Sequence, residues 1–121
     1  MKYLLLIYAQ ESDWSTFTQA QAGAMTAEYG KFTEEITAGG KNLGANRLKP
    51  VASATTVRVR DGKRVVTDGP FAETKEQLGG YYLVEAADLD EAIAIAAKIP
   101  GARVGSIEVR PIFAMEQAAG Y

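Results

Sequence analysis

The 121-residue sequence contains neither histidine nor cysteine. Without an imidazole or a thiol, the chain can form no Ser-His-Asp triad and no Cys-His pair, so these routes to nucleophilic catalysis are excluded. Disulfides, and zinc or copper sites built from histidine and cysteine, are excluded for the same reason. Carboxylate, lysine, arginine, tyrosine and hydroxyl chemistry is left, and we expect neither a metal nor a cofactor.

The composition is that of an ordinary globular protein, with 47% hydrophobic and 23% charged residues. We expect a single domain over residues 1–121. The net charge of −2 argues against a general nucleic-acid binder. The apolar start over residues 1–8 is shorter than the ~20 residues of a membrane-spanning helix, and no small-residue cleavage site follows it. We therefore expect a cytoplasmic protein that binds neither nucleic acid nor a membrane.

The charges are distributed unevenly along the chain. Residues 1–40 carry a net charge of −3, residues 41–70 a net charge of +5, and residues 71–121 a net charge of −4. The basic middle third suits a small anionic ligand, or it forms a solvated hairpin between acidic helices. The sequence leaves both interpretations open.

The pattern of apolar residues predicts two β-α-β halves with a hairpin inserted between them. Residues 9–20 have a loop-like composition, and residues 72–78 are expected to form a charged connector or a short helical turn. This order predicts an α+β, ferredoxin-like sandwich, with a tail of uncertain order from about residue 114. The expected strands are 3–8, 42–50, 55–60, 63–67, 81–86 and 106–110, and the expected helices are 18–38 and 89–99.

The first predicted strand, over residues 3–8, is apolar on both of its faces. A strand of this kind is covered on both faces in the folded protein. The helices of so short a chain can cover one face only, and a second subunit is the simplest cover for the other. We therefore expect a homodimer whose open sheet faces pack into a barrel-like core.

The densest group of reactive side chains follows the second hairpin strand. Asp68 precedes a Gly-Pro turn there, and Glu73 and Lys75 come within the next seven residues. A partly buried Asp68 would act as a general base, with Arg58 or Lys75 holding an anionic intermediate. Alternatively, Asp68 accepts backbone hydrogen bonds and only fixes the turn. The candidate ligand-binding residues are Arg58, Glu73, Lys75 and Tyr82.

Two further aromatic features are open to interpretation. Tyr81 and Tyr82 are adjacent on a predicted strand, so one faces the helices and the other faces the open side. A tyrosine in a cleft can donate a hydrogen bond or act as an acid, whereas a core tyrosine keeps only its hydroxyl at the rim. Trp14 is either a lid over a pocket or an anchor for its loop.

Residues 66–82, which contain the run Asp68-Gly69-Pro70-Phe71, resemble the signature of the DGPF-domain branch of the YCII-related family. Residues 88–92 and 107–111 resemble the same family, so the resemblance extends over nearly the whole chain. It implies a dimeric α/β barrel. It also implies a functional link to an extracytoplasmic-function sigma factor, because many DGPF-type proteins are encoded beside, or fused to, such factors.

The wider family includes an enzyme that removes chloride from a chlorinated hydroquinone, with a histidine–aspartate dyad proposed for it. Asp68 corresponds to the aspartate, and the histidine falls near Tyr29 in a chain that has no histidine. The preferred hypothesis is therefore a dimeric module that binds an unknown small molecule or has a regulatory, accessory role. The alternative is a cofactor-free enzyme of lyase, isomerase or dehydrochlorinase type, with Asp68 as its general base.

Overall fold

The computed structural model describes residues 1–114, so the tail expected beyond this point lies outside the described residues. Four strands form one antiparallel sheet in the order β2-β5-β1-β6, and β3 pairs with β4 in a separate two-stranded sheet. The strands are β1 (Lys2–Ala9), β2 (Asn42–Arg47), β3 (Thr55–Arg60), β4 (Lys63–Asp68), β5 (Gln77–Glu85) and β6 (Ser106–Pro111).

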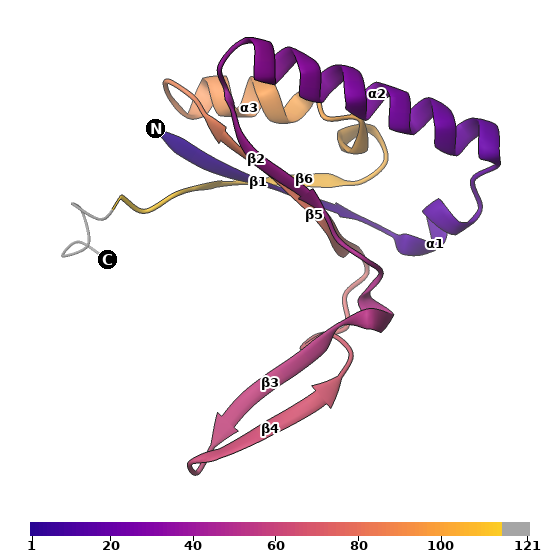
Figure 1. Ribbon diagram of the computed structural model, residues 1–121, viewed down its shortest axis with the longest axis vertical. Coiled ribbons are helices and arrows are strands. Elements are labelled where there is room, and N and C mark those ends of the chain that lie inside the picture. Colours follow the sequence, from indigo (N-terminus) through magenta and orange to yellow (C-terminus); the bar gives the residue numbers. More distant parts are fainter. Residues whose placement is uncertain (115–121) are drawn as a thin grey trace.

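The two longer helices lie on one face of the four-stranded sheet (Figure 1). The helices are α1 (Glu11–Ser15), α2 (Gln19–Ala38) and α3 (Leu89–Ala97), with short 3₁₀ helices η1 (Val51–Ser53) and η2 (Pro100–Arg103). The predicted order of two β-α-β halves with an inserted hairpin is confirmed, and this α+β arrangement is compatible with a ferredoxin-like fold. Within residues 1–114, no helix combines the length and apolar character needed to cross a membrane.

Strand β1 lies at the centre of the sheet, where it pairs with β5 on one side and β6 on the other. Its side chains alternate as predicted. Tyr3 and Leu5 are buried under the helices, whereas Leu4 and Leu6 are half-buried on the opposite face. No described helix covers that opposite face (Figure 1).

The hydrophobic core lies between the sheet and the two longer helices. Phe32 of α2 meets Tyr82 of β5 edge to face, with the ring centroids 5.0 Å apart and an interplanar angle of 81°, a geometry that the aromatic quadrupoles favour. Ala92 and Ala96 are buried on α3, and their small side chains let this helix approach the sheet closely. Ile36, one turn further along α2 than Phe32, is buried as well.

Local signals fix the ends of several elements. Thr18 caps α2, since its hydroxyl accepts a hydrogen bond from the Gln21 amide while the Gln21 side chain accepts from the Thr18 amide. Gly40, just beyond the end of α2, has a φ of +73°, which glycine adopts without strain. The Asp61-Gly62 turn has positive φ at both residues, as expected for a type I′ hairpin turn.

Three segments differ from the sequence-based prediction. Helix α1 occupies part of the expected loop over residues 9–20, because Glu11 and Asp13 lie in its first turn, where the helix dipole favours acidic side chains. Strand β2 ends at Arg47 rather than at residue 50. Strand β5 begins four residues early, because its first residue already pairs with Ala9 of β1, and residues 72–76 form no helical turn.

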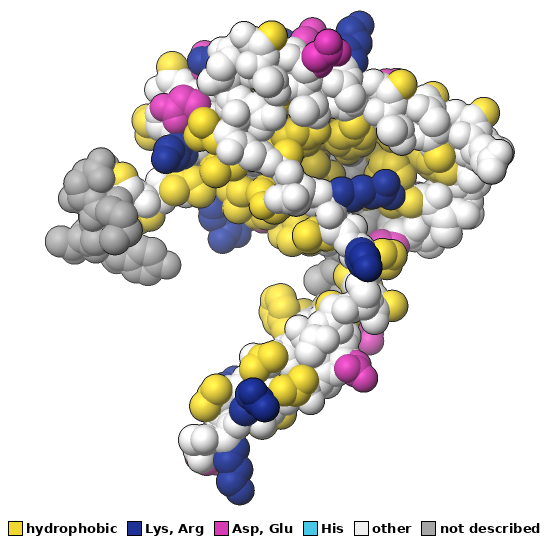
Figure 2. Space-filling model, viewed as in Figure 1, with side chains coloured by type: hydrophobic (Ala, Val, Ile, Leu, Met, Phe, Trp, Pro, Cys, Tyr) yellow, Lys and Arg dark blue, Asp and Glu magenta, His cyan; other side chains and the backbone are white. Residues whose placement is uncertain are grey.

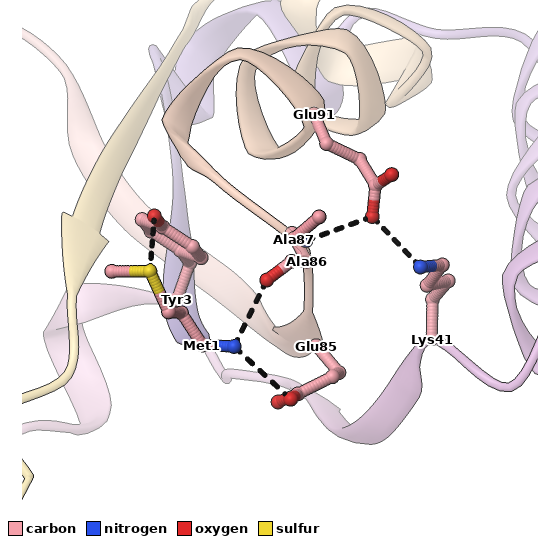
Figure 3. Close-up of polar contacts among 7 residues, drawn as sticks. All are labelled: Met1, Tyr3, Lys41, Glu85, Ala86, Ala87 and Glu91. Atoms are coloured by element: carbon pink, nitrogen blue, oxygen red, sulfur yellow. Dashed lines mark hydrogen bonds and ion pairs between the residues drawn. The ribbon is translucent and has the colours of Figure 1, made fainter.

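Lys41 and Glu91 join the sheet edge to α3 (Figure 3). Lys41 Nζ donates a hydrogen bond to Glu91 Oε1 at 2.8 Å, and the Ala87 amide donates to the same oxygen at 3.1 Å. The Lys41 ammonium, together with the Ala87 amide, lowers the pKa of Glu91 below its ordinary value. Asp88 caps α3 by accepting a hydrogen bond from the Glu91 amide at 2.9 Å. The Glu91 carboxylate binds Lys41 and Ala87 in place of the capping-box bond back to Asp88.

Glu91→Gln is expected to destabilise the protein at neutral pH and progressively less in acid. A carboxylate with a lowered folded-state pKa contributes stability above its unfolded-state pKa, and this contribution is lost as the pH falls through the folded-state value. The difference in free energy of unfolding between wild type and variant, measured by urea denaturation across the acid range, should therefore shrink with falling pH. Glu34→Gln, at an exposed position on α2, is the control. A difference at Glu91 that does not change with pH would contradict the ion pair's contribution.

Gly105 marks a close approach between the chain after η2 and the end of β1. A Cβ at this position would overlap the Tyr8 carbonyl oxygen and press on Ala9. Gly105→Ala is therefore expected to lower the free energy of unfolding by ~2 kcal/mol or more, since backbone must move. Gly23→Ala, at a helical position with open space around the new Cβ, should raise it by ~0.5 kcal/mol or more. Chemical denaturation of both variants tests this, and effects of the same sign would contradict it.

Candidate functional site

A cavity of about 620 Å³ opens between α1, α2 and the adjoining ends of β2 and β5. Figure 2 shows a hollow in this region with hydrophobic side chains inside it and a cationic side chain at its rim. The apolar and aromatic part of the lining includes Ile7, Trp14, Met25, Tyr29 and Leu48. Small-molecule sites in proteins have volumes of roughly 300–1,000 Å³ and a mostly apolar lining, so the cavity has the size and character of a ligand site.

Helix α2 brings the Tyr29 hydroxyl to this cavity. Its oxygen accepts a hydrogen bond from the Gly101 amide at 3.1 Å. Burial raises the pKa of Tyr29 above its ordinary value, and the Gly101 bond offsets part of that rise. The phenol therefore keeps its hydrogen at neutral pH. Within the described chain, no hydrogen bond takes up that hydrogen, which leaves it available to a ligand.

Arg47 places a positive charge at the same cavity. It is the last residue of β2 and lies opposite Gly80 of β5. Its charge acts on the Tyr29 hydroxyl in the direction of a lower pKa, although less strongly than the charge of Arg103 does. Over residues 1–114, the guanidinium forms no ion pair with a carboxylate. Because an arginine side chain stays protonated, the cavity carries a permanent cation.

Glu11 and Gln77, by contrast, use their polar groups to hold the cavity wall together. Glu11 Oε2 accepts a hydrogen bond from the Val51 amide at 2.9 Å, and the Glu11 amide donates to Gln77 Oε1 at 3.0 Å. The Gln77 side-chain amide donates in turn to the Thr74 carbonyl at 2.6 Å. These bonds give the wall a defined shape and leave Arg47 as the cation available to a ligand.

Tyr82 also lines the cavity, as do Tyr81 and Trp14, the other aromatic residues that the sequence brought forward. Its hydroxyl lies 2.7 Å from Thr33 Oγ1. Thr33 gives its own hydrogen to the Tyr29 carbonyl at 2.8 Å, so Tyr82 is the donor in the pair. Tyr82 faces the helices, whereas Tyr81 faces the open side and accepts a hydrogen bond from Asn46 Nδ2 at 2.8 Å. The predicted alternation of the two tyrosines is confirmed.

The other predicted site residues lie away from the cavity. Asp68 ends β4 in an exposed position opposite Thr55, and the hairpin register places Arg58 on the other face of the same hairpin. Glu73 and Lys75 are exposed in the connection between β4 and β5. The structure therefore does not assemble these four side chains around one space within a protomer. The catalytic role of Asp68 stays a prediction.

No sequence motif marks Arg47 or Glu11 as a site residue, and Tyr29 stands out in the sequence only by its place near the position of the family's histidine. That position was the available signal for Tyr29, since it places a polar group on the inner face of α2. Arg47 was hidden among the seven cationic residues of the basic middle third. Trp14, left open between lid and anchor, lines the cavity and packs with its ring centroid 5.2 Å from that of Phe17.

The fold and the cavity define a small α+β domain with a ligand-sized site beneath its first long helix. The chain belongs to the YCII-related family, because the model of the YCII-related domain matches residues 1–116. It is also 39% identical, over 114 residues, to an uncharacterized protein of Rhizobium meliloti (strain 1021), an alignment that covers 93% of this chain and 92% of the relative. The resemblance to the YCII-related family is confirmed at the level of the family.

Proposed function

We propose that this protein is a small-molecule-binding module with a regulatory or accessory role, and that its ligand occupies the cavity beneath α2. One observation carries the proposal. Arg47 and Tyr29 line an apolar cavity of about 620 Å³, and the Arg47 guanidinium and the Tyr29 phenol hydrogen have no partner within the described chain. Ligand sites combine apolar walls with a few such polar groups.

The same groups suggest the chemistry of the ligand. A guanidinium donates two parallel hydrogen bonds to a carboxylate, and the Tyr29 phenol donates one to an oxygen. Trp14 and Met25 favour an apolar or aromatic body, because both side chains are large, polarisable and apolar. The ligand class proposed is therefore an organic acid whose anionic group lies near Arg47.

We also propose a homodimer in which the open faces of two four-stranded sheets pack into a barrel-like core. The support is the apolar group that Leu4, Leu6 and Leu83 form on the open face, half-buried and without a helix over it in the described protomer. The ion pair of Arg110 and Glu108 on β6 borders this group beside Leu4 and Leu6. Sheet faces of this composition are stable in water only when another layer covers them. A second copy presents the same surface and provides that layer.

The Asp68-Gly69-Pro70-Phe71 run supports placement of the chain in the DGPF branch of its family. The functional link to an extracytoplasmic-function sigma factor, and the cytoplasmic location, stay predictions. The alternative function is a cofactor-free enzyme with Asp68 as its general base. Asp68, however, is exposed at the end of β4 and does not line the cavity. The geometry of one protomer therefore favours ligand binding over proton abstraction.

A panel of aromatic carboxylates, tested beside the matching neutral amides, should identify binders by thermal shift. A carboxylate present at about one hundred times its Kd should stabilise the folded protein by ~2.7 kcal/mol. Arg47→Gln should weaken binding by about tenfold or more, because a charge-assisted hydrogen bond contributes ~1.5 kcal/mol or more.

Two controls separate the cavity from the signature loop. Arg58→Gln removes an exposed cation on the hairpin, and Asp68→Asn removes the proposed base; both variants should bind like wild type. The binding proposal fails if no carboxylate shifts the transition, or if Arg47→Gln and Arg58→Gln weaken binding equally. Loss of binding only in Asp68→Asn would instead favour the alternative function.

Leu6→Glu should convert a dimer into a monomer. The substitution places a charge on the open sheet face, where burial against a second copy would leave it unpaired. Light scattering should give the wild type twice the 13.0 kDa protomer mass and the variant the protomer mass. Leu89→Glu, at an exposed position on α3, is the matched control and should stay dimeric. A monomeric wild type at micromolar concentration contradicts the dimer.

A further inference from the structure

The hairpin of β3 and β4 has no core of its own. It forms a separate two-stranded sheet and projects from the body on the side of the four-stranded sheet that faces away from the helices (Figure 1). Every residue of its two strands except Thr56 is exposed. A two-stranded hairpin alone in water is marginally stable at best, so this hairpin needs a surface to pack against.

The register of the hairpin separates its side chains into two different faces. One face carries three valines, Val57, Val59 and Val66, with exposed fractions of 58%, 63% and 56%. Arg64 lies on the same face opposite Val59, and Thr55 and Asp68 lie on it at the root of the hairpin. The other carries three cations with one valine: Arg58, Arg60, Lys63 and Val65. The first, here called the valine face, presents three apolar side chains with Arg64 and Asp68 beside them, and the second is called the cationic face. An apolar surface of this kind, rimmed by charge, is typical of an interaction site.

The signature loop adds to the same surface region. Phe71 follows β4 directly after the Gly69-Pro70 turn and is 81% exposed, more than the other exposed large hydrophobic residues of the described chain. The motif that characterises the sequence therefore has an aromatic side chain with almost no cover in the protomer.

The root of the hairpin is held firmly enough to keep the valine face away from its own body. Glu11 binds the amide of Val51 ahead of β3 and, through its own amide, the side chain of Gln77 after β4. The Gly69 amide also donates to the Ala54 carbonyl at 2.7 Å. The hairpin thus leaves the sheet edge in a defined direction. Figure 2 shows hydrophobic side chains along it and on the underside of the body across an open gap.

The net charges of the hairpin and of the rest of the chain favour a second copy of the protein as the partner that fills this gap. Residues 55–68 hold four cationic and two acidic side chains, a net charge of +2, which leaves −4 on the rest of a chain whose total is −2. A second copy offers an acidic body to this basic arm and receives a basic arm on its own acidic body. A reciprocal contact of this kind is what a two-fold symmetric dimer produces, and opposite net charges favour the encounter.

We propose that the β3–β4 hairpin is an exchange arm, which packs its valine face and Phe71 against the second copy in the homodimer. The arm rests on the homodimer proposed above and extends it from the sheet face to the signature loop. The exposed valines, the exposed Phe71 and the inserted hairpin then have one common explanation: they are buried only in the dimer.

The test compares dimer dissociation constants by sedimentation equilibrium. A triple variant with Val57, Val59 and Val66 changed to Thr keeps β-branched side chains but makes the valine face polar, and it should weaken the dimer by about tenfold or more. Val65→Thr makes the same chemical change on the cationic face of the same hairpin and should leave the dissociation constant unchanged. Phe71 lies outside both strands, so Phe71→Ser is expected to weaken the dimer without destabilising the hairpin. This variant tests the proposed contact if the triple variant does not fold.

Each outcome distinguishes the arm from the dimer itself. A wild-type dimer that the triple variant and Phe71→Ser weaken, and that Val65→Thr leaves intact, supports the arm. A wild-type dimer that neither the triple variant nor Phe71→Ser weakens overturns the arm and leaves the sheet-face dimer standing. A monomeric wild type overturns both. Equal weakening by the triple variant and Val65→Thr would show a general effect on the hairpin and would also overturn the specific contact.

Discussion

The central position of β1 is the constraint on which the rest of the structure depends. Because β1 pairs with β5 on one side and β6 on the other, it holds the two β-α-β halves in one sheet. Tyr3 and Leu5 extend from it into the core, where both are almost completely buried. The alternate positions, Leu4 and Leu6, necessarily face the other way. A strand that is apolar or aromatic from Tyr3 onward thus anchors the helices on one side and places Leu4 and Leu6 on the side without a helix.

Glu11 connects the cavity to the inserted hairpin. Its side chain and its amide hold the two chain segments that lead to and from the hairpin, through Val51 and Gln77, and Glu11 and Gln77 themselves line the cavity. A hydrogen bond to an ionised carboxylate is stronger than one between neutral groups, so one residue of the short helix α1 supports both regions. The proposed ligand site and the proposed arm therefore share a structural element, although they face different partners.

The sequence predicted elements best where a local stop or turn signal was present. The glycines after α2, the Asp61-Gly62 turn and the Asp88 cap all lie where the structure has an element boundary. Such signals work because a cap or a tight turn needs only its immediate neighbours. Helix α1 and the early start of β5 were missed, since they depend on contacts such as the pairing of Ala9 with Gln77, which join segments far apart in the chain.

The sequence by itself determined the order of the elements, the two apolar faces of the first strand and the family resemblance. These depend on alternation, helical periodicity and a contiguous motif, all of which can be read along the chain. Only the tertiary structure decided which side chains meet. Asp68 and Arg58 are near each other in sequence, yet the hairpin register turns them to opposite faces. Tyr29 and Arg47 come from different elements and converge at one cavity, because strand register and helix packing, rather than sequence spacing, set the direction of a side chain.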